Sequence, residues 1–419
     1  MSGREKSGIL GGVMQIKVLP GDFAVTEVLA VPLAEGGRYA VYRARKRAIT
    51  TLQLQNRLAA ALGLSTSAVA FPALKDRQAV AVQFGTVRGA GPPQVKGRGF
   101  TAERVGWLDR RLSPGDLAGN RFSAVLRDLS QDEAARVTTR LAEMAHCGLP
   151  NYFDEQRFGS RLADGEFPGR LILRRDEVGA LRAHLAGQQI GDAAEVRAFK
   201  AFAATQWGDW EAIFERAPKP SNYRSVLTYL RDHPDGYRRA LNLVTPRVLS
   251  LYLAAYQSFL WNRLAGRTLQ AKLEAADVPL GTVSIGGETL PVYRQLPQDL
   301  LASLEGIKLP LLHHRLQPED PTVASFIEAI LDKEGFARRD LKARVLKKAY
   351  LGKGARALLL LPRDLTWEAA EADERFPGQH KLTVRFFLAR GSYATLLFKA
   401  ASIDDSHPRR KHRDATTNA

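Results

Sequence analysis

The sequence contains little cysteine and no long apolar run. Cys147 is the single thiol among 419 residues, which excludes an internal disulfide and a metal site built from several thiolates. No stretch of about 18 consecutive apolar residues occurs, so we expect no membrane-spanning helix. The opening residues, MSGREKSGILGGVMQIKV, hold only a short apolar patch and no secretory signal. These absences predict a cytoplasmic protein in a reducing compartment.

Acidic residues are too few to balance the basic ones. The chain has 61 Lys and Arg against 44 Asp and Glu, which gives a net charge of +17. Such a surplus favours a polyanionic partner, with nucleic acid ahead of an anionic membrane surface. Metal and nucleotide signatures are missing as well. The histidines show no ligand spacing, and the Gly/Pro-rich segment RGAGPPQVKGRGF lacks the Lys-Ser/Thr of a P-loop.

The secondary-structure patterns predict two kinds of region. Residues 14–171 and 351–403 mix strand-like alternation with amphipathic helices, which is typical of an α+β domain. Residues 172–350 are mostly helical, with one β-rich interlude around a Gly-Gly turn signal. We therefore predict a helical domain inserted into an α+β domain. Residues 1–13 and the basic tail 404–419 are expected to be disordered.

Local signals predict several helix ends. Thr50 or Thr51 can cap the helix over TLQLQNRLAAALG, and Gly148 can end the helix over QDEAARVTTRLAEMAHC. The stretch DAAEVRAFKAFAATQWGDWEAIFERA is expected to be mostly helical. A helix is also expected over TPRVLSLYLAAYQSFLWNRLAG, with Pro246 in its first turn. The stretch MQIKVLPGDFAVTEV is typical of two strands joined by a Pro-Gly turn.

The segment FPALKDRQAVAVQFGTV raises the question of function most directly. Lys75, Asp76 and Arg77 lie together between two apolar runs. One interpretation is a surface turn whose ion pair contributes less than about 1 kcal/mol. The other is an aspartate that neighbouring cations hold ionised for work on a negatively charged substrate, since an opposite charge favours the ionised form. The tripeptide alone favours the first interpretation.

Several sequence blocks resemble those of one enzyme family. ALKDRQAVAVQ resembles the Gly-x-Lys-Asp-x-x-Ala-x-Thr-x-Gln signature of the TruD family of tRNA pseudouridine synthases. The blocks KVLPGDFAVTE, LPNYFDEQRFG and VRFFLARGSYAT match in order, and AAYQSFLWNRL resembles a block inside the helical region. The resemblance extends from Lys17 to Lys399. It implies a pseudouridine synthase fold, a mixed or antiparallel sheet with helices, interrupted by a largely helical family-specific insertion domain.

The resemblance implies an isomerase that acts on tRNA. Uridine becomes pseudouridine, at position 13 of the D-arm in bacterial members, when uracil leaves its ribose, turns, and rejoins C1′ through C5. No cofactor or metal is implied, and we expect a monomer. Two alternatives stay open. One is a structured-RNA binder or RNA chaperone that has lost turnover. The other is an RNA glycosidase, although the matched blocks lack a second carboxylate or His as general acid.

The resemblance also implies which residues carry the chemistry. Asp76 is the catalytic carboxylate, as a nucleophile or as a base. Its expected supports are Lys75, Arg77 and Gln83, and the two cations are expected to keep it ionised. With all the blocks in view, the catalytic interpretation of the Lys-Asp-Arg tripeptide replaces the surface ion pair.

Aromatic and amide side chains at matching positions are implied to hold a flipped nucleotide. A base taken out of its stack costs a few kcal/mol, and stacking on an aromatic ring returns about 1–3 kcal/mol. The implied nucleotide-binding residues are Phe23, Asn151, Phe153 and Tyr393. For Phe153 a position in the core is an equal alternative. Secondary roles are implied for Lys17, Glu27 and Arg157, the last as a brace of the active-site loop.

Two basic runs are candidates for contacts with the tRNA backbone. They are RARKR and LKARVLKKAYLGKGAR. Such patches supply sequence-independent affinity that falls with salt. Each alone is more typical of a solvated face, and together with the net charge they favour an RNA-binding surface. The predicted contacts are Arg43, Arg45, Lys46, Arg47, Lys347 and Lys348.

Three positions depart from the family pattern. Ala73 replaces the usual Gly, Ala81 the usual Thr, and Asp154 the usual Gly. A hydroxyl near the loop is therefore missing, and a negative charge is added beside the expected pocket. These departures motivate the non-catalytic alternative. The Lys75–Asp76 pair is retained, so we expect an active enzyme.

Overall fold

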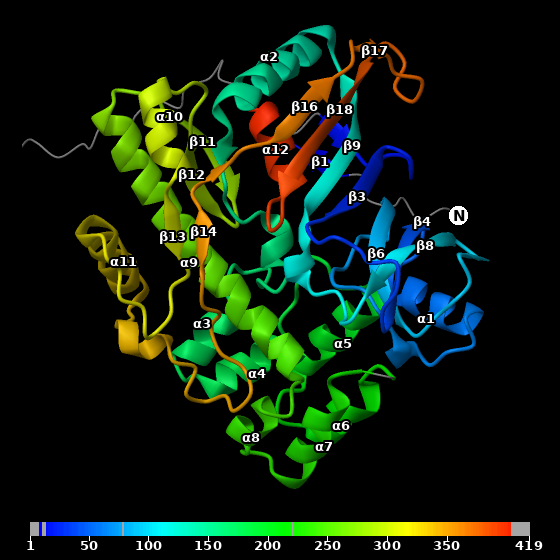
Figure 1. Cartoon of the computed structure of the whole chain (residues 1–419). Helices are drawn as coiled ribbons and strands as arrows, with labels where there is room; N and C mark the ends of the chain where they lie inside the picture. The colour runs from blue at the N-terminus through cyan, green and yellow to red at the C-terminus, as the bar shows by residue number, and fades with distance from the viewer. Residues whose placement is uncertain (1–7, 11–13, 78, 220, 404–419) are drawn as a thin grey trace, which may run out of the picture. The chain divides into compact units, whose positions relative to one another are not determined.

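The computed structural model describes residues 8–10, 14–77, 79–219 and 221–403, which form two compact units (Figure 1). The first unit runs to Leu149 and resumes at Leu360, and the second is Pro150–Leu359. The domain boundaries expected from the sequence, 172 and 350, lie inside the second unit. Of the ends expected to be disordered, residues 404–419 and most of 1–13 lie outside the described residues. Gly8–Leu10 forms strand β1.

The first unit is built on one mixed sheet of twelve strands, which confirms the predicted α+β class. The pairing of β3 with β6 is parallel, and the other described pairs of this sheet are antiparallel. The main strand order is β1-β2-β9-β3-β6-β4-β8-β7, and β18 also pairs with β9. The strands are β1 (Gly8–Leu10), β2 (Met14–Ile16), β3 (Phe23–Leu29), β4 (Tyr39–Lys46), β5 (Val69–Ala70), β6 (Val80–Arg88), β7 (Gln94–Gly97), β8 (Phe100–Leu108), β9 (Leu117–Leu129), β16 (Arg363–Trp367), β17 (Glu371–Ala372) and β18 (His380–Ala389).

Strand β9 organises the part of the sheet that carries the site. β18 pairs with one edge of β9, and β2 and β3 pair with the other. The turn between β2 and β3 is anchored by Arg127 of β9. Its guanidinium donates two hydrogen bonds of 3.0 Å to Asp22 and one of 2.8 Å to Asp373. All three side chains are buried, so breaking this ion-pair network would leave a buried charge without its partner.

Three helices accompany this sheet. α2 and α12 pack against each other beside β18, and α1 packs beside β5 and β7 (Figure 1). Thr50 caps α1: its hydroxyl accepts from the N–H of Gln53, whose side chain bonds back to the Thr50 N–H. Gly148, with a φ of 65°, follows the last residue of α2, as predicted. The helices are α1 (Thr51–Ala61), α2 (Gln131–Cys147) and α12 (Ala394–Ala401).

The second unit is largely helical. The long helix α9 packs against α3, α11 and strand β12, and it is buried over much of its circumference for that reason (Figure 1). Two small antiparallel pairs, β11–β12 and β13–β14, complete the unit. The helices are α3 (Pro168–Leu173), α4 (Glu177–Leu185), α5 (Ala194–Thr205), α6 (Trp210–Arg216), α7 (Arg224–Asp232), α8 (Tyr237–Leu241), α9 (Pro246–Ala275), α10 (Gln298–Glu305) and α11 (Pro321–Glu334), and the strands are β11 (Gly281–Ile285), β12 (Glu288–Val292), β13 (Lys308–Pro310) and β14 (Ala355–Ala357).

Two helical stretches differ from the sequence prediction. Helix α9 continues past Gly266 to Ala275. The glycine is needed inside the helix for close packing, since a Cβ there would lie 3.3 Å from Leu290 and from Pro291. The stretch around residues 192–217, expected to be mostly helical, forms two helices, α5 and α6, with a break between them. Gly208 lies in the connection with a φ of 106°, a conformation that a helix does not contain.

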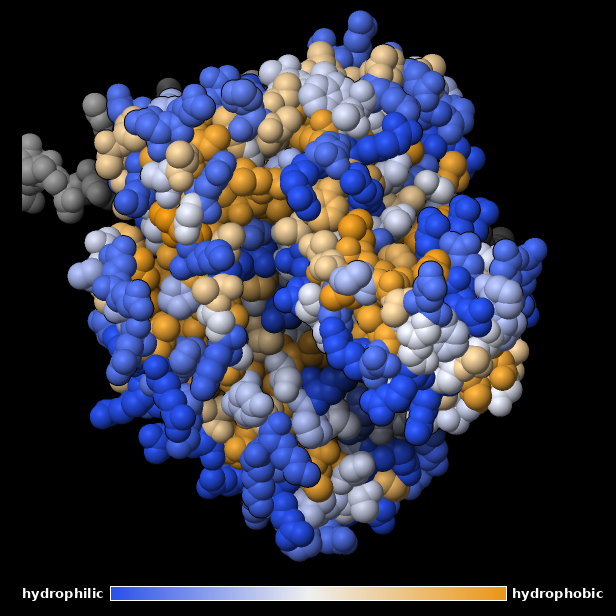
Figure 2. All heavy atoms as spheres, in the orientation of Figure 1, coloured by the Kyte–Doolittle hydropathy of each residue, from blue (hydrophilic) through white to orange (hydrophobic). Residues whose placement is uncertain are grey.

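Hydrophilic side chains dominate the face of the second unit that Figure 2 shows over α7 and α8. Arg238 and Arg239 of α8 are among the exposed cations. Within the described residues, no helix combines the length and the apolar character that a membrane-spanning segment requires.

Candidate active site

The loop that carries Asp76 connects β5 to β6, and its backbone is held by a buried lysine. Lys46, the last residue of β4, is fully buried. Its Nζ donates to the carbonyl oxygen of Asp76 at 2.6 Å and to that of Ile49 at 2.9 Å. Burial lowers the pKa of Lys46, because it disfavours the charged form, and the nearby Asp76 opposes this effect. A buried ammonium group thus fixes the position of the Asp76 main chain.

A chain of neutral hydrogen bonds holds the same loop from the other side. The N–H of Lys75 donates to Oγ1 of Thr51 at 2.9 Å, and this hydroxyl donates to Oε1 of Gln83 at 3.0 Å. The Gln83 amide in turn donates to the carbonyl oxygen of Ala73 at 2.9 Å. Thr51 is the first residue of α1 and Gln83 lies in β6, and both are buried. The helix start and the strand therefore both fix the loop.

The Asp76 side chain itself remains accessible. Its carboxylate is 45% exposed and lies 3.0 Å from Nζ of Lys17. The same ammonium group lies 4.6 Å from the centre of the Phe23 ring. Lys17 has a φ of 60°, which is uncommon for a residue with a side chain and costs backbone energy. The anchored turn between β2 and β3 thus presents a cation to the carboxylate.

The cations adjacent to Asp76 in sequence contact other groups as well, and their expected role in keeping Asp76 ionised stays a prediction. The Lys75 ammonium lies 3.0 Å from the buried carboxylate of Glu27 and donates to Oδ1 of Asn120 at 2.6 Å. Arg77 donates to the carbonyl oxygen of Ala48 at 3.3 Å. The described ion pair of Asp76 is instead with Lys17, which is distant in sequence. Alternate residues of an extended loop point in different directions, and sequence adjacency therefore did not indicate the partner.

Glu27 and Lys75 form a buried pair beneath the loop. Glu27 faces Asn120 in the register of β3 and β9, and its Oε2 accepts from the N–H of Phe84 at 2.8 Å. Burial raises the pKa of Glu27, while the ammonium group of Lys75 and the hydrogen bonds oppose the rise. The secondary role implied for Glu27 thus has a physical counterpart, because the carboxylate orients Lys75 beside Asp76.

The cations of the first basic run, RARKR, are partly exposed and partly buried. The alternation of β4 exposes Arg43 and Arg45, and Arg47, which follows the strand, is exposed as well. Arg43 lies 3.1 Å from Glu103. The prediction that Lys46 contacts the tRNA backbone is wrong, because its side chain is buried and bonds to two carbonyl oxygens. A groove of about 540 Å³ beside β4 is lined in part by the exposed cations Arg43, Arg45 and Lys96.

Two predicted nucleotide-binding residues of the first unit lie in different environments. Phe23 begins β3 and is only 5% exposed, with its ring 5.9 Å from that of Phe122. Its described neighbours make it a support for Lys17. Tyr393 directly precedes α12 and is half-buried. The first unit thus gathers Lys17, Phe23, Glu27, Lys75, Asp76 and Gln83 around one loop.

In the second unit, Asn151 and Phe153 are locked in place by their neighbours. The Arg356 guanidinium donates to the carbonyl oxygen of Asn151 at 2.7 Å and to its Oδ1 at 2.6 Å. It also lies 4.2 Å from the Phe153 ring. Asn262 of α9 closes the segment by exchanging two hydrogen bonds of 2.8 Å with the backbone of Phe153. Both predicted residues are buried, so for Phe153 the structure favours the core alternative.

Arg157 and the second basic run complete the predicted residues. Nε of Arg157 donates to Ser258 at 2.9 Å, and its guanidinium lies 5.5 Å from the Phe153 ring. Both contacts lie within the second unit, and the role implied for Arg157 as a brace of the active-site loop stays a prediction. Lys347 and Lys348 are exposed, in a stretch where buried and exposed residues nearly alternate.

The three departures from the family pattern fit the local backbone. Ala73 and Asp154 have φ values that residues with side chains adopt readily, so neither position requires glycine. Asp154 is buried just before the short helix 155–158, rather than projecting freely into solvent. Ala81 is fully buried in β6, where a small side chain packs without strain. The departures therefore leave the hydrogen-bonded loop intact.

Three residues that hold the site were not identified from the sequence. Thr51 was considered only as a helix cap, Asn120 was one polar residue in a strand, and Asn262 was one residue of a family block. The block AAYQSFLWNRL was a signal for Asn262. For Thr51 and Asn120 the deciding contacts are long-range, and no local pattern indicates them.

Comparison with known proteins assigns the chain to a family. The family model for tRNA pseudouridine synthase D (TruD) matches residues 6–400. The chain belongs to the TruD family of tRNA pseudouridine synthases. It is 30% identical over 401 residues to the tRNA pseudouridine synthase D of Geobacter sp., covering 92% of this chain and 94% of the relative. It is 25% identical over 399 residues to that of Aquifex aeolicus, covering 94% and 99%.

A solved structure supports the fold assignment. The crystal structure of a protein from Methanosarcina mazei that carries the name TruD superposes with a TM-score of 0.68, at 20% identity and over 95% of each chain. At this identity the likeness extends to the fold alone. The fold expected from the resemblance is thereby confirmed. Among the described residues, no group of three or more His, Cys, Asp or Glu side chains is placed to hold a metal ion.

Proposed function

We propose that this chain converts a uridine of tRNA into pseudouridine, at position 13 of the D-arm, with Asp76 as the group that meets the target nucleotide. The observation that carries the proposal is a half-exposed carboxylate on a loop whose backbone is clamped from two sides. Lys46 and Thr51 hold the main chain, and Lys17 faces the carboxylate at 3.0 Å. A reacting group held within a fraction of an ångström supplies much of the effect of proximity in catalysis.

The reaction balances without any co-reactant. The C1′–N1 bond breaks, the uracil ring turns, and a C1′–C5 bond forms. The proton on C5 is then lost and N1 gains one, so substrate and product are isomers. The Asp76 carboxylate takes part either as a nucleophile on the sugar or base or as a base toward the sugar. Both routes need it as an anion, and the ammonium group of Lys17 lies 3.0 Å from it.

The supporting roles follow from the contacts. Glu27 and Asn120 orient Lys75 beside the reacting group, and Tyr393 supplies an aromatic face to the flipped base. Asn151 and Phe153 act as a rigid block, because both are already bonded or packed within the second unit. Exposed cations hold the RNA backbone through contacts that weaken with salt. They are Arg43, Arg45, Arg47, Lys347 and Lys348.

The test is a site-resolved pseudouridine map of an unmodified tRNA transcript treated with the protein. We expect product at position 13 with the wild type and a rate lower by about 10³-fold with Asp76→Asn, since a positioned carboxylate contributes on this order. Binding of the transcript should stay within about threefold, or less than about 1 kcal/mol. Asp132→Asn, an exposed change on α2, is the matched control.

The outcomes separate the alternatives. Product elsewhere in the tRNA would overturn position 13 alone. Binding without product from the wild type would favour a non-catalytic RNA binder, and free uracil would favour a glycosidase. Unchanged turnover in Asp76→Asn would mean that Asp76 is not the catalytic residue.

A further inference from the structure

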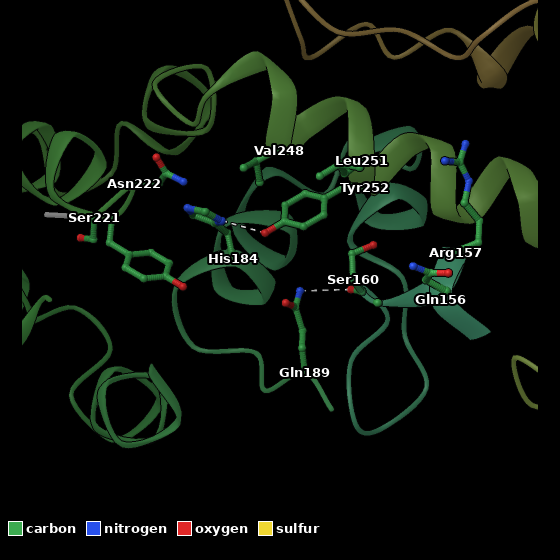
Figure 3. Close-up of a pocket in the computed structure, with 12 residues that line it drawn as sticks. Gln156, Arg157, Ser160, His184, Gln189, Ser221, Asn222, Val248, Leu251 and Tyr252 are labelled. Carbon is green, nitrogen blue, oxygen red and sulfur yellow. Dashed lines mark hydrogen bonds between the residues drawn. The ribbon is translucent and has the colours of Figure 1, made fainter. Parts of the chain in front are cut away.

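The second unit contains a cavity whose lining includes Arg157 but none of the other predicted site residues. It has a volume of about 520 Å³, within the range of about 300–1,000 Å³ that is typical of small-molecule sites. Its walls come from residues 156–160, from α4, from the segment before α7 and from α9 (Figure 3). Arg157 and Gln156 line one end, whereas Ser221 and Asn222 line the other (Figure 3).

Three buried polar atoms of the lining residues have no hydrogen-bond partner among the described residues. They are Nε2 of His184, Oγ of Ser160 and Oγ of Ser221. Unpaired buried polar groups are rare and costly, at about 1–3 kcal/mol each, unless water or a ligand completes them. His184 is only 3% exposed, and its Nδ1 lies 2.8 Å from the Tyr252 hydroxyl. Its other ring nitrogen points toward the Ser221–Asn222 side of the cavity in Figure 3.

The part of the cavity near His184 suits an uncharged ligand group. Burial, with a smaller contribution from the nearby Lys200, lowers the pKa of His184 to about 3, so the imidazole is neutral at pH 7. Burial raises the pKa of Tyr252, which keeps its hydroxyl protonated. No carboxylate is among the lining residues, which disfavours a metal ion. A single cation, Arg157, also disfavours a free polyphosphate.

The remaining walls are apolar or aromatic. Val248, Leu251 and the ring of Tyr223 line the cavity, and the Tyr223 ring lies 5.2 Å from that of His184. A planar ring with several donors and acceptors on its edge fits such a mixture, since its faces contact apolar walls and its edge meets hydroxyl and amide groups. The Arg157 end suits the phosphate attached to such a ring.

We infer that this cavity binds one unstacked nucleobase of the substrate tRNA, at a nucleotide other than the uridine that reacts. The reacting uridine must meet Asp76, which does not line the cavity. The inference rests on the proposed function, because the substrate RNA supplies the base. The bound nucleobase gives the second unit a specificity role, selecting tRNAs in which that base can leave its stack.

The first experiment measures steady-state kinetics on the tRNA transcript with two altered cavities. Val248→Phe fills the cavity, and Ser160→Ala combined with Ser221→Ala removes two of the unpaired hydroxyls. We expect KM to rise about 10- to 100-fold for the first and about 3- to 10-fold for the second, since one stacked base is worth about 1–3 kcal/mol. The kcat should be unchanged at saturation, because Asp76 and its clamps are untouched. Ser303→Ala, an exposed serine of α10, is the matched control, and thermal unfolding checks each fold.

The second experiment identifies the nucleotide. Single abasic substitutions are placed along the transcript, away from the target uridine. One position should raise the wild-type KM by about the factor seen for Val248→Phe, and the same substitution should add nothing in that variant. Independent, multiplicative effects at every position would overturn the inference, as would a KM that neither altered cavity changes. Free nucleoside monophosphates tested as competitors at millimolar concentration should bind far more weakly than the tRNA. Equal potency would mean that the cavity serves a free nucleotide.

The two proposals fail in distinguishable ways. No pseudouridine from the wild type would contradict the proposed function, and tRNA binding by the altered cavities could still be measured. Normal wild-type turnover with unaltered KM values in all cavity variants would contradict only the nucleobase cavity.

Discussion

The two units hold their family segments by similar means but with different results. In the first unit, side chains of Lys46, Thr51 and Gln83 bind the backbone of the loop and leave the Asp76 carboxylate 45% exposed. In the second unit, Asn262 and Arg356 bind the backbone of the segment 151–153, and Arg356 also binds its side chains. The result there is a buried block.

The difference indicates whether the hydrogen bonds of each unit serve mainly the geometry of a loop or mainly the stability of the core. A loop that must present a charged side chain has few contacts of its own, so its geometry depends on long-range hydrogen bonds to the main chain. A segment that is itself buried contributes to the core, and its hydrogen bonds contribute mainly to stability. Changes in the clamps of the first unit should therefore affect turnover, and changes in those of the second should affect the free energy of unfolding.

The largest effect on turnover after Asp76 itself is expected for Lys46→Met. The loss of two hydrogen bonds lets the Asp76 backbone shift, and a displacement near 1 Å can lower turnover about 10²-fold. Binding of tRNA and its salt dependence should not change, because the side chain is buried. Arg45→Gln, the exposed neighbour, should leave kcat unchanged while lowering the salt slope of binding by about 1. A reduced salt slope for Lys46→Met would mean that Lys46 does contact the tRNA backbone.

Asn262→Ala tests the second unit. It removes two hydrogen bonds to the buried N–H and carbonyl oxygen of Phe153, and at about 1–3 kcal/mol for each we expect a loss of about 2–6 kcal/mol in the free energy of unfolding. Chemical denaturation measures it. Gln270→Ala, an exposed change on the same helix, is the control. A large fall in kcat without loss of stability would contradict the distinction between the two units.

Two adjacent threonines offer a finer comparison within the first unit. Thr51→Val keeps the shape of the side chain but breaks the hydrogen-bond chain from Lys75 to Gln83, and we expect kcat to fall about 10-fold because the loop is less well positioned. Thr50→Val removes the helix cap and should cost about 1 kcal/mol of stability with little change in kcat. Steady-state kinetics and thermal unfolding of both variants separate the effect on kcat from the effect on stability. Equal effects on kcat would assign the loss to the helix rather than to the loop.

The smallest effect is a dependence of stability on pH. Burial raises the pKa of Glu27 in the folded chain above its usual value of 4.5. A carboxyl group of this kind contributes stability that is fully present below the unfolded pKa and is lost as pH rises through the folded pKa. The wild type should therefore lose stability relative to Glu27→Gln as pH rises from about 4 to 7. Glu103→Gln, an exposed change on β8, is the control. An opposite slope would mean that Lys75 outweighs burial.

Much of the catalytic unit could be predicted because its signals are local. Helix caps at Thr50 and Gly148 depend on residues a few positions apart, and the Lys75–Asp76 pair lies within one short block. The role of Lys46 was missed, although the alternation of β4 places it on the same face as the buried Tyr42 and Ala44. Its bond to the carbonyl oxygen of Asp76 is long-range and has no local signal.

Composition and short motifs alone determined the α+β class with its helical insertion, the basic character and the family resemblance, because each is encoded in nearby residues. Tertiary structure alone decided that Lys17 pairs with Asp76 and Lys75 with Glu27, that Lys46 is a buried clamp, and that His184, Ser160 and Ser221 meet around one cavity. Side chains from distant segments meet only when the chain packs, and hydrogen bonds that span many residues leave no local pattern in a sequence.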